Sequence, residues 1–355
     1  MIKKFLLLIL IFAAVGTGLS YENHPVSEVI ERIKSREVSY PFRFAFIGDS
    51  RKSFRPGDPD ADSIFRLHLR VLERLNPAFG IHGGDFCLRG YRSEYEHFVS
   101  MIDSFDVNLL PVAGNHELYA PEGPYMFRKI FQSKICPPGG FWNHLKAFFL
   151  NPFNVSEGLR RFNDPCDYYF DYAGYRFIFL VDNHQSPKKS PKGGYYVNYY
   201  LSEKQIKWLE KRLKEADSLG LFKVVVAHVP PYIPGHNTKH CLGALYYYPK
   251  PNYEKSHTKE FTDLLAKYHV SLGLFSHQHL YDRYVYDGVT YIVSGGAGAP
   301  LKRPLQETPY GGSFYHIVLF EADSTGFIKG HIYRLGETEP DTTFDFVVPP
   351  PVGAE

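Results

Sequence analysis

The stretch LLPVAGNHE, residues 109–117, is the most informative part of the chain. Its first half is apolar, and a glycine is then followed at once by Asn115, His116 and Glu117. An apolar run that stops abruptly at such residues is typical of a buried strand that delivers polar side chains to the edge of a sheet. A loop cap would explain the asparagine alone, so the histidine and glutamate indicate a functional site.

Four further apolar runs, at residues 42–47, 78–82, 223–227 and 270–275, end in the same way. Each is followed closely by aspartate or histidine. Ligands of open α/β sheets bind at the carboxyl ends of the strands, so we expect these side chains to meet at one place. The predicted metal ligands are Asp49, Asp85, Asn115, His228, His277 and His279.

The predicted ligands are carboxylates, an amide and imidazoles, without a thiolate. This mixture suits Mn, Fe, Zn or Co better than Ca. His277 and His279 are two residues apart, so on a strand they would face the same side. A carboxylate shared by two cations would hold them roughly 3.5–4 Å apart, which is the spacing used for in-line phosphoryl displacement. We therefore predict a transition-metal site.

The remaining pattern predicts an α/β fold with helices covering a sheet. Apolar residues recur at helical spacing in segments 63–76, 95–102 and 261–268, and Ser202 with Gln205 forms a capping box that would open another helix. The C-terminal runs 289–293, 314–320 and 327–333 have no helical segment between them, which suggests a second, partly antiparallel sheet. We predict a layered α/β sandwich over residues 40–335.

Several segments lack this periodicity. Residues 120–165 and 230–256 look like insertions, residues 184–200 are rich in Tyr, Pro and Lys, and residues 339–355 look like an extended surface tail. Tyrosine pairs and triplets, such as Tyr195–Tyr196 and residues 246–248, could stack on a sugar or base. They could equally serve as amphipathic anchors of their loops.

The N-terminal residues 1–20, MIKKFLLLILIFAAVGTGLS, have the layout of a signal peptide. Their apolar run is short for a membrane span, which needs roughly 20 residues. We therefore expect export to the periplasm or the extracellular space, with an uncleaved N-terminal anchor as the alternative. No stable membrane span is expected after cleavage.

The four cysteines, Cys87, Cys136, Cys166 and Cys241, are an even number, which permits disulfides in an exported protein. Four cysteines allow three pairings, and the sequence alone does not choose among them. Cys136 and Cys166 are favoured because they flank one insertion. The net charge of +2 provides no electrostatic footprint for nucleic acid, so no nucleic-acid partner is expected.

Taken together, these motifs resemble the calcineurin-like metallophosphoesterases, which include purple acid phosphatases, Ser/Thr phosphatases and phosphodiesterases. That family has the pattern Asp-X-His, Gly-Asp, Gly-Asn-His-(Asp/Glu), His and Gly-His-X-His, and the resemblance covers about residues 40–300. It implies a four-layer α/β/β/α sandwich with two mixed sheets and a two-metal site. By position, Asp85 would bridge the metals, Asp49 and His279 would hold the first, and Asn115, His228 and His277 the second.

Two positions depart from the family pattern. Arg51 stands where many relatives place a ligand histidine, and Leu88 stands where purple acid phosphatases have an iron-binding tyrosine. The first metal would then be completed by water, and the planar guanidinium of Arg51 could bind the substrate phosphate. The alternative is that Arg51 is a surface or salt-bridge residue.

The resemblance implies hydrolysis of a small phosphomonoester or phosphodiester. Hydroxide generated at the metals would attack phosphorus in line. His116, oriented by Asp85 or Glu117, would act on the leaving oxygen. The alternative function is a non-catalytic exported binding protein that keeps the fold and a partial metal site, which the missing ligand at Arg51 would favour.

Overall fold

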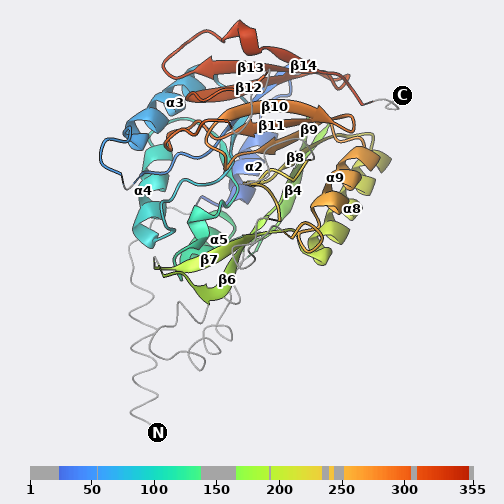
Figure 1. Cartoon of the computed structure of the whole chain (residues 1–355). Coiled ribbons are helices and arrows are strands. Elements are labelled where there is room, and N and C mark those ends of the chain that lie inside the picture. Colours follow the sequence, from blue (N-terminus) through green and yellow to red (C-terminus); the bar gives the residue numbers. More distant parts are fainter. Residues whose placement is uncertain are drawn as a thin grey trace, which may run out of the picture.

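Two six-stranded sheets form the centre of the molecule, as a computed structural model shows (Figure 1). The structure describes residues 24–53, 55–136, 165–191, 193–233, 240–243, 252–304 and 310–351. The signal-peptide prediction for residues 1–20 lies outside these residues, as do residues 137–164 of one predicted insertion and residues 234–239 and 244–251 of the other. Among the described helices, none is long and apolar enough to cross a membrane.

The first sheet has the strand order β14-β13-β12-β1-β2-β3. Three neighbouring strands run parallel: β1 (Phe42–Ile47), β2 (Phe79–His82) and β3 (Leu109–Pro111). Three further strands continue the sheet in antiparallel pairs: β12 (His316–Ala322), β13 (Ile328–Arg334) and β14 (Phe346–Val348). The parallel strands are buried over nearly their whole length, as their continuous apolar runs predict.

The second sheet has the order β10-β11-β9-β8-β5-β4. Its strands are β4 (Tyr168–Tyr172), β5 (Tyr175–Phe179), β8 (Phe222–Val226), β9 (Leu272–Phe275), β10 (Tyr281–Tyr286) and β11 (Val289–Ser294). The four central strands are parallel, and an antiparallel strand closes each edge. A separate hairpin is formed by β6 (Asn183–Lys189) and β7 (Tyr195–Tyr199).

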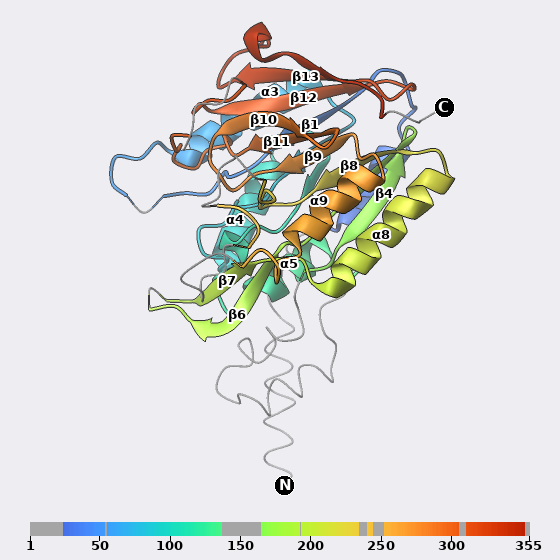
Figure 2. The ribbon, with the colours of Figure 1, turned by 45° about the vertical axis from the view of Figure 1, so that its right-hand side comes forward.

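Helices cover the outer faces of the two sheets. Figures 1 and 2 show α3 (Ala61–Leu75) and α4 (Arg92–Ile102) on one side of the sheets and α8 (Glu203–Ser218) and α9 (Thr258–Lys267) on the other. The capping box predicted at Ser202 is confirmed, because its hydroxyl accepts the backbone N–H of Gln205 at the start of α8. The four-layer α/β/β/α architecture is therefore confirmed.

Aromatic side chains join the two sheets. Phe177 of β5 meets Phe44 of β1 edge-to-face at 5.2 Å and Phe79 of β2 at 5.0 Å, measured between ring centroids. All three rings are fully buried. Burying each such side chain contributes about 1.5–3 kcal/mol, and each ring pair adds about 0.5–1.5 kcal/mol. This packing keeps the carboxyl ends of β1, β2 and β5 in fixed relative positions.

The C-terminal strands are distributed differently from the prediction. The run at 289–293 became β11 of the second sheet, whereas β12 pairs with β1 in the first sheet and β13 pairs with β12. A one-dimensional pattern does not carry the sheet partner of a strand, so the three runs appeared to belong together. The segment 339–355 is also not wholly a surface tail, because Phe346 and Val348 of β14 are buried against β13.

Three further elements were not anticipated. Helix α2 (Val26–Lys34) lies before residue 40 and buries Val26 and Ile33 in the common core. Helix α5 (Gly123–Phe131) forms inside the segment 120–165. The β6–β7 hairpin forms inside the Tyr-rich segment. The favoured Cys136–Cys166 disulfide is confirmed, while Cys87 and Cys241 are buried and form no disulfide.

Candidate metal centre

The structure brings all six predicted ligands together where β1, β2, β3, β8 and β9 end. Their donor atoms form two groups. One group contains Asp85, His228 and His277, and the other contains Asp49, Asp85 and His279. Within each group the atoms lie within 4.8 Å of one another. Asp85 belongs to both groups, which is the arrangement expected of a carboxylate that bridges two cations.

Four of these residues adopt left-handed backbone conformations. The φ angles are 59° at Asp49, 58° at Asp85, 69° at His277 and 47° at His279. Such values cost energy in a non-glycine residue and persist only where the surroundings enforce them. Here the β1 and β2 loops hold each other, because Asp49 N–H donates to the carbonyl of Gly84 at 2.9 Å. The strained backbone at these strand ends directs the four side chains toward one point.

Glycine is required where another chain segment passes close to a donor. A Cβ on Gly114 would lie 2.3 Å from Asp85 Oδ1, and one on Gly295 would lie 2.5 Å from Asp49 Oδ2. Either contact would push a carboxylate out of the cluster. These two glycines therefore help to set the positions of the predicted ligands.

Hydrogen bonds fix the orientation of the ligands in the first group. His228 Nδ1–H donates to the carbonyl of Gly83 at 2.7 Å, which leaves Nε2 to face the cluster. That Nε2 lies 3.2 Å from Asn115 Oδ1, 3.1 Å from His277 Nδ1 and 3.3 Å from Asp85 Oδ1. The Asn115 amide is oriented by its Nδ2–H bond to the hydroxyl of Tyr119 at 2.6 Å. Four donor atoms therefore converge on one small space.

The second group has three members, whereas Asn115 joins the first group as a fourth. His279 Nδ1–H donates to the carbonyl of Pro300 at 2.8 Å, so its Nε2 faces Asp49 Oδ1 at 3.3 Å. The other carboxylate oxygen of Asp49 accepts the backbone N–H of His277 at 2.7 Å. Arg51 lies alongside, with Nε 3.8 Å from Asp85 Oδ2 and Nη1 donating to the carbonyl of Lys52 at 3.1 Å.

The donor set fits transition metals. Among the described residues, Asp49 Oδ1, which faces the second group, is buried without a hydrogen-bond partner, although buried polar atoms normally have one. Burial holds the pKa of His277 well below its ordinary value, so its imidazole is neutral and able to ligate. Burial raises the pKa of Asp49, but the neighbouring His279 and other positive groups outweigh this and lower it. A carboxylate and a neutral imidazole are the protonation states that metal binding needs.

His116 lies beside the cluster. Its Nδ1–H donates to the carbonyl of Leu88 at 2.6 Å, and its Nε2 is 3.9 Å from Asp85 Oδ2. Burial lowers the pKa of His116 to about 3, so the ring is neutral at physiological pH. The expectation that a carboxylate orients this ring is wrong, because the Leu88 carbonyl makes the Nδ1 contact.

Glu117 does not orient His116 as expected, and binds backbone N–H groups instead. Its carboxylate accepts the backbone N–H groups of Asp85, Phe86, Cys87 and Gly114 at 2.7–2.9 Å. It thereby ties the loop after β2 to the loop after β3. Glu117 is a structural support of two ligands, which its place in the motif did not reveal.

Asp182 is a supporting residue that the sequence reasoning missed. It is buried, and its carboxylate accepts the backbone N–H of Val229, next to His228, at 2.7 Å. Burial raises the pKa of Asp182 to about 7. The signal was present, because Asp182 follows the apolar strand β5 in the same way that the predicted ligands follow theirs.

Known proteins share features of sequence and of fold with this chain. Residues 42–281 match the family described as calcineurin-like phosphoesterase. No curated protein matches the chain significantly in sequence. The fold is similar to a purple acid phosphatase from yellow lupin (Lupinus luteus) seeds, with a TM-score of 0.57 and 17% identity over 88% of this chain. This chain spans 54% of the lupin enzyme.

A second structural neighbour is closer in size. A dimetal phosphatase from Danio rerio has a TM-score of 0.57 and 14% identity, covering 88% of this chain and 99% of its own. At such identities the similarity establishes the fold.

Proposed function

Because the chain belongs to the calcineurin-like phosphoesterase family, we propose that it hydrolyses a phosphomonoester or phosphodiester in a metal-dependent reaction. The observation that carries this proposal is the pair of donor groups that share Asp85, with His116 and Arg51 at their edge. A fold of this kind does not by itself determine activity, so the chemistry is argued from the site.

The ligands divide according to the two groups. Asp49 and His279 would hold one cation, Asn115, His228 and His277 the other, and Asp85 both. Two such ions, of Mn, Fe, Zn or Co, would supply hydroxide from water at neutral pH and neutralise charge on the phosphoryl group. The chain's part is to hold the imidazole of His277 neutral and the carboxyl group of Asp49 ionised.

His116 is placed to act on the leaving oxygen. Since Nδ1–H is held by Leu88, Nε2 is the atom at which a proton is gained and passed on. Burial disfavours the charged ring in the free protein, and the negative charge of a bound phosphate would oppose this effect. His116 would therefore take up its proton when substrate is bound and transfer it from Nε2 to the departing oxygen.

Arg51 would bind the equatorial phosphate oxygens. Its Nε is buried without a hydrogen-bond partner within the described part of the chain, and its side chain is 15% exposed. A guanidinium with unused donors beside a phosphate site can make charge-assisted, planar contacts. This supports a substrate contact for Arg51 over a purely surface position.

We also propose that the protein acts outside the cytoplasm. The Cys136–Cys166 disulfide supports this, because disulfides persist mainly in oxidising compartments. Secretion of the full-length chain with removal of residues 1–20, seen by mass spectrometry of the mature protein, would test it. An intact N-terminus on a cytoplasmic protein would contradict it.

The function is tested with p-nitrophenyl phosphate and bis(p-nitrophenyl) phosphate. The purified chain, loaded in turn with Mn, Fe, Zn or Co, is expected to hydrolyse at least one of the two, and the preferred ester assigns the monoesterase or diesterase class. Metal content is measured in the same samples. Bound metal without turnover of either ester would overturn the enzyme proposal and favour a non-catalytic binding protein.

A further inference from the structure

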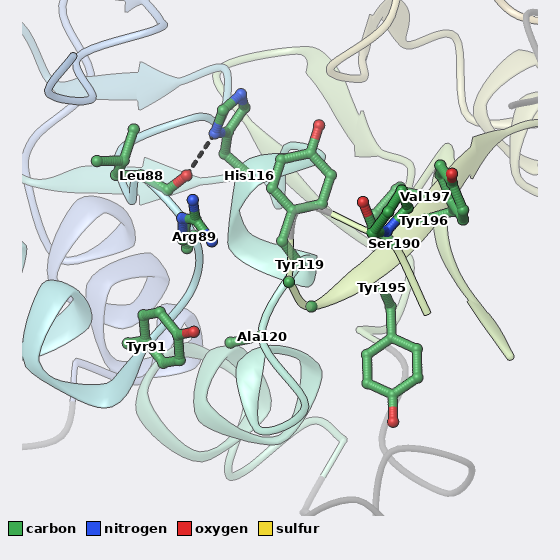
Figure 3. Close-up of a pocket in the computed structure, with 13 residues that line it drawn as sticks. Leu88, Arg89, Tyr91, His116, Tyr119, Ala120, Ser190, Tyr195, Tyr196 and Val197 are labelled. Atoms are coloured by element: carbon green, nitrogen blue, oxygen red, sulfur yellow. Dashed lines mark hydrogen bonds between the residues drawn. The ribbon is translucent and has the colours of Figure 1, made fainter. Parts of the chain in front are cut away.

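A cavity of about 310 Å³ opens beside His116 (Figure 3). Its lining comes from three parts of the chain: the loop after β2 around Leu88, the segment that follows His116, and residues 190–191 and 193–197 of the β6–β7 hairpin. His116 is the lining residue that also faces Asp85, at 3.9 Å. The cavity is therefore a neighbour of the metal centre and shares His116 with it.

The walls of the cavity are held together by backbone hydrogen bonds. Ala120 N–H donates to the carbonyl of Arg89 at 2.7 Å, and Tyr195 N–H donates to the carbonyl of Tyr119 at 2.8 Å. The side chain of Gln185 on β6 donates to the carbonyl of Ala120 at 2.8 Å. These bonds fasten the hairpin to the loop that carries His116, so the cavity is formed before any ligand enters.

Several of the lining residues carry aromatic rings. The ring of Tyr119 packs edge-on against His116, with centroids 4.8 Å apart, and its hydroxyl is fixed by Asn115. Tyr91 and Tyr196 add further rings, and Arg89 adds a guanidinium. Figure 3 shows Tyr119 between His116 and the hairpin residues. Flat rings stack favourably on tyrosine and arginine, whereas small aliphatic groups gain little from such walls.

We propose that this cavity binds the leaving group of the phosphoester and selects a flat, ring-bearing group over a small aliphatic one. The inference rests on the proposed function, because it takes His116 as the residue that meets the leaving oxygen. A phosphate at the metal centre would then direct its ester group past His116 toward Tyr119. The volume suits a single ring or a nucleoside-sized group, since ligand pockets typically begin at about 300 Å³.

Binding of non-hydrolysable analogues tests the cavity separately from catalysis. Phenylphosphonate and methylphosphonate are titrated into the metal-loaded full chain by calorimetry. Phenylphosphonate is expected to bind about tenfold more tightly, as expected for one stacked ring. Equal affinities would overturn the inference, whatever the turnover results are.

Turnover distinguishes the two sources of a ring. Phenyl phosphate, a nucleoside 5′-monophosphate and glycerol 2-phosphate are compared by kcat/KM. Either ring-bearing ester is expected to exceed glycerol 2-phosphate by about tenfold, and the better of the two identifies an aryl or a nucleoside leaving group. A preference for glycerol 2-phosphate would contradict the inference while leaving the phosphoesterase proposal intact.

Variants of the cavity wall complete the test. Tyr196→Ala and, as an independent second variant, Tyr91→Ala are expected to reduce the phenyl-to-methyl affinity ratio about threefold to tenfold, while methylphosphonate binding stays unchanged. Tyr119 is unsuitable because it contacts Asn115. Tyr169→Ala, on β4 and stacked with Arg176 at 4.6 Å, is the matched control and should leave the ratio unchanged. An unchanged ratio in both wall variants would overturn the assignment.

The outcomes separate the two proposals. If no ester is hydrolysed but phenylphosphonate still binds more tightly and Tyr196→Ala removes the difference, the enzyme proposal fails and the cavity remains a ring-binding site. If esters are hydrolysed without any preference for a ring in binding or turnover, the cavity inference alone fails.

Discussion

The metal centre has two halves, one for each cation, and they differ in the number of ligands that the chain supplies. The full half consists of Asp85, Asn115, His228 and His277, and the short half consists of Asp49, His279 and the shared Asp85. In the short half, Arg51 lies beside the carboxylate of Asp85. It occupies the position at which the family pattern has a ligand histidine. Fewer donors and a neighbouring positive charge both weaken cation binding. We therefore expect one tightly held and one weakly held metal.

The largest loss of turnover is expected on substitution of Asp85, which belongs to both halves. Asp85→Asn should remove the bridging charge from both and reduce turnover by about 1,000-fold or more, because several kcal/mol of charge stabilisation are lost. Metal content should fall in both halves. Asp167→Asn is the control, since Asp167 is a carboxyl with a pKa raised to about 6 by burial that belongs to neither donor group. Retention of both metals by Asp85→Asn would refute the bridging assignment.

The next largest effect concerns the residue outside both halves. His116→Ala should reduce turnover about 100-fold or more, as expected for loss of an acid–base group, while both metal stoichiometries remain. The measurement pairs kcat with metal analysis. His97→Ala, a half-exposed histidine bound to Asp62, should leave kcat unchanged. Full turnover in His116→Ala would remove His116 from the mechanism.

The sharpest test of the comparison itself is Arg51→His. This change introduces a ligand type and removes a positive charge, so the affinity of the short half should rise about tenfold, with a smaller change in the full half, which shares Asp85. Calorimetric titration of the metal-free protein should show two unequal steps in the wild type and more similar steps in the variant.

The control for that experiment is the neighbouring residue. Lys52→His changes a surface lysine paired with Asp62 and should leave both steps unchanged. If the wild type already binds two metals with equal affinity, the two halves do not differ as described.

Low pH should weaken metal binding by the full half. Burial lowers the pKa of His228, but the carboxylates of Asp85, Asp49 and Asp182 outweigh it and raise the pKa above its ordinary value. A protonated imidazole cannot ligate, so metal affinity is complete above this pKa and falls as pH drops through it. The loss should be about tenfold per pH unit below the pKa. Metal retention after dialysis between pH 8 and pH 5 measures it, and a constant affinity over that range would contradict the assignment.

The parts of the fold that could be predicted are those with a strong local pattern. β1 begins and ends where its apolar run does, and α8 begins at the predicted capping box. The edge strands β4 and β10 were missed because their polar and aromatic residues alternate weakly, and β14 was missed because it has only three residues. The division of β11 and β12 between the sheets was also missed, because β12 pairs with β1, which is distant in the sequence.

The sequence by itself determined which residues could act. Aspartates, an asparagine and histidines at the ends of apolar strands predicted the six ligands, since strand ends converge at one edge of a sheet. The tertiary structure alone decided how they are used. It fixed the tautomer of His228 through Gly83, turned Glu117 into a support for two loops, and placed Arg51 beside Asp85. Hydrogen-bond partners and close charges come from segments far apart in the chain, and no local pattern encodes their geometry.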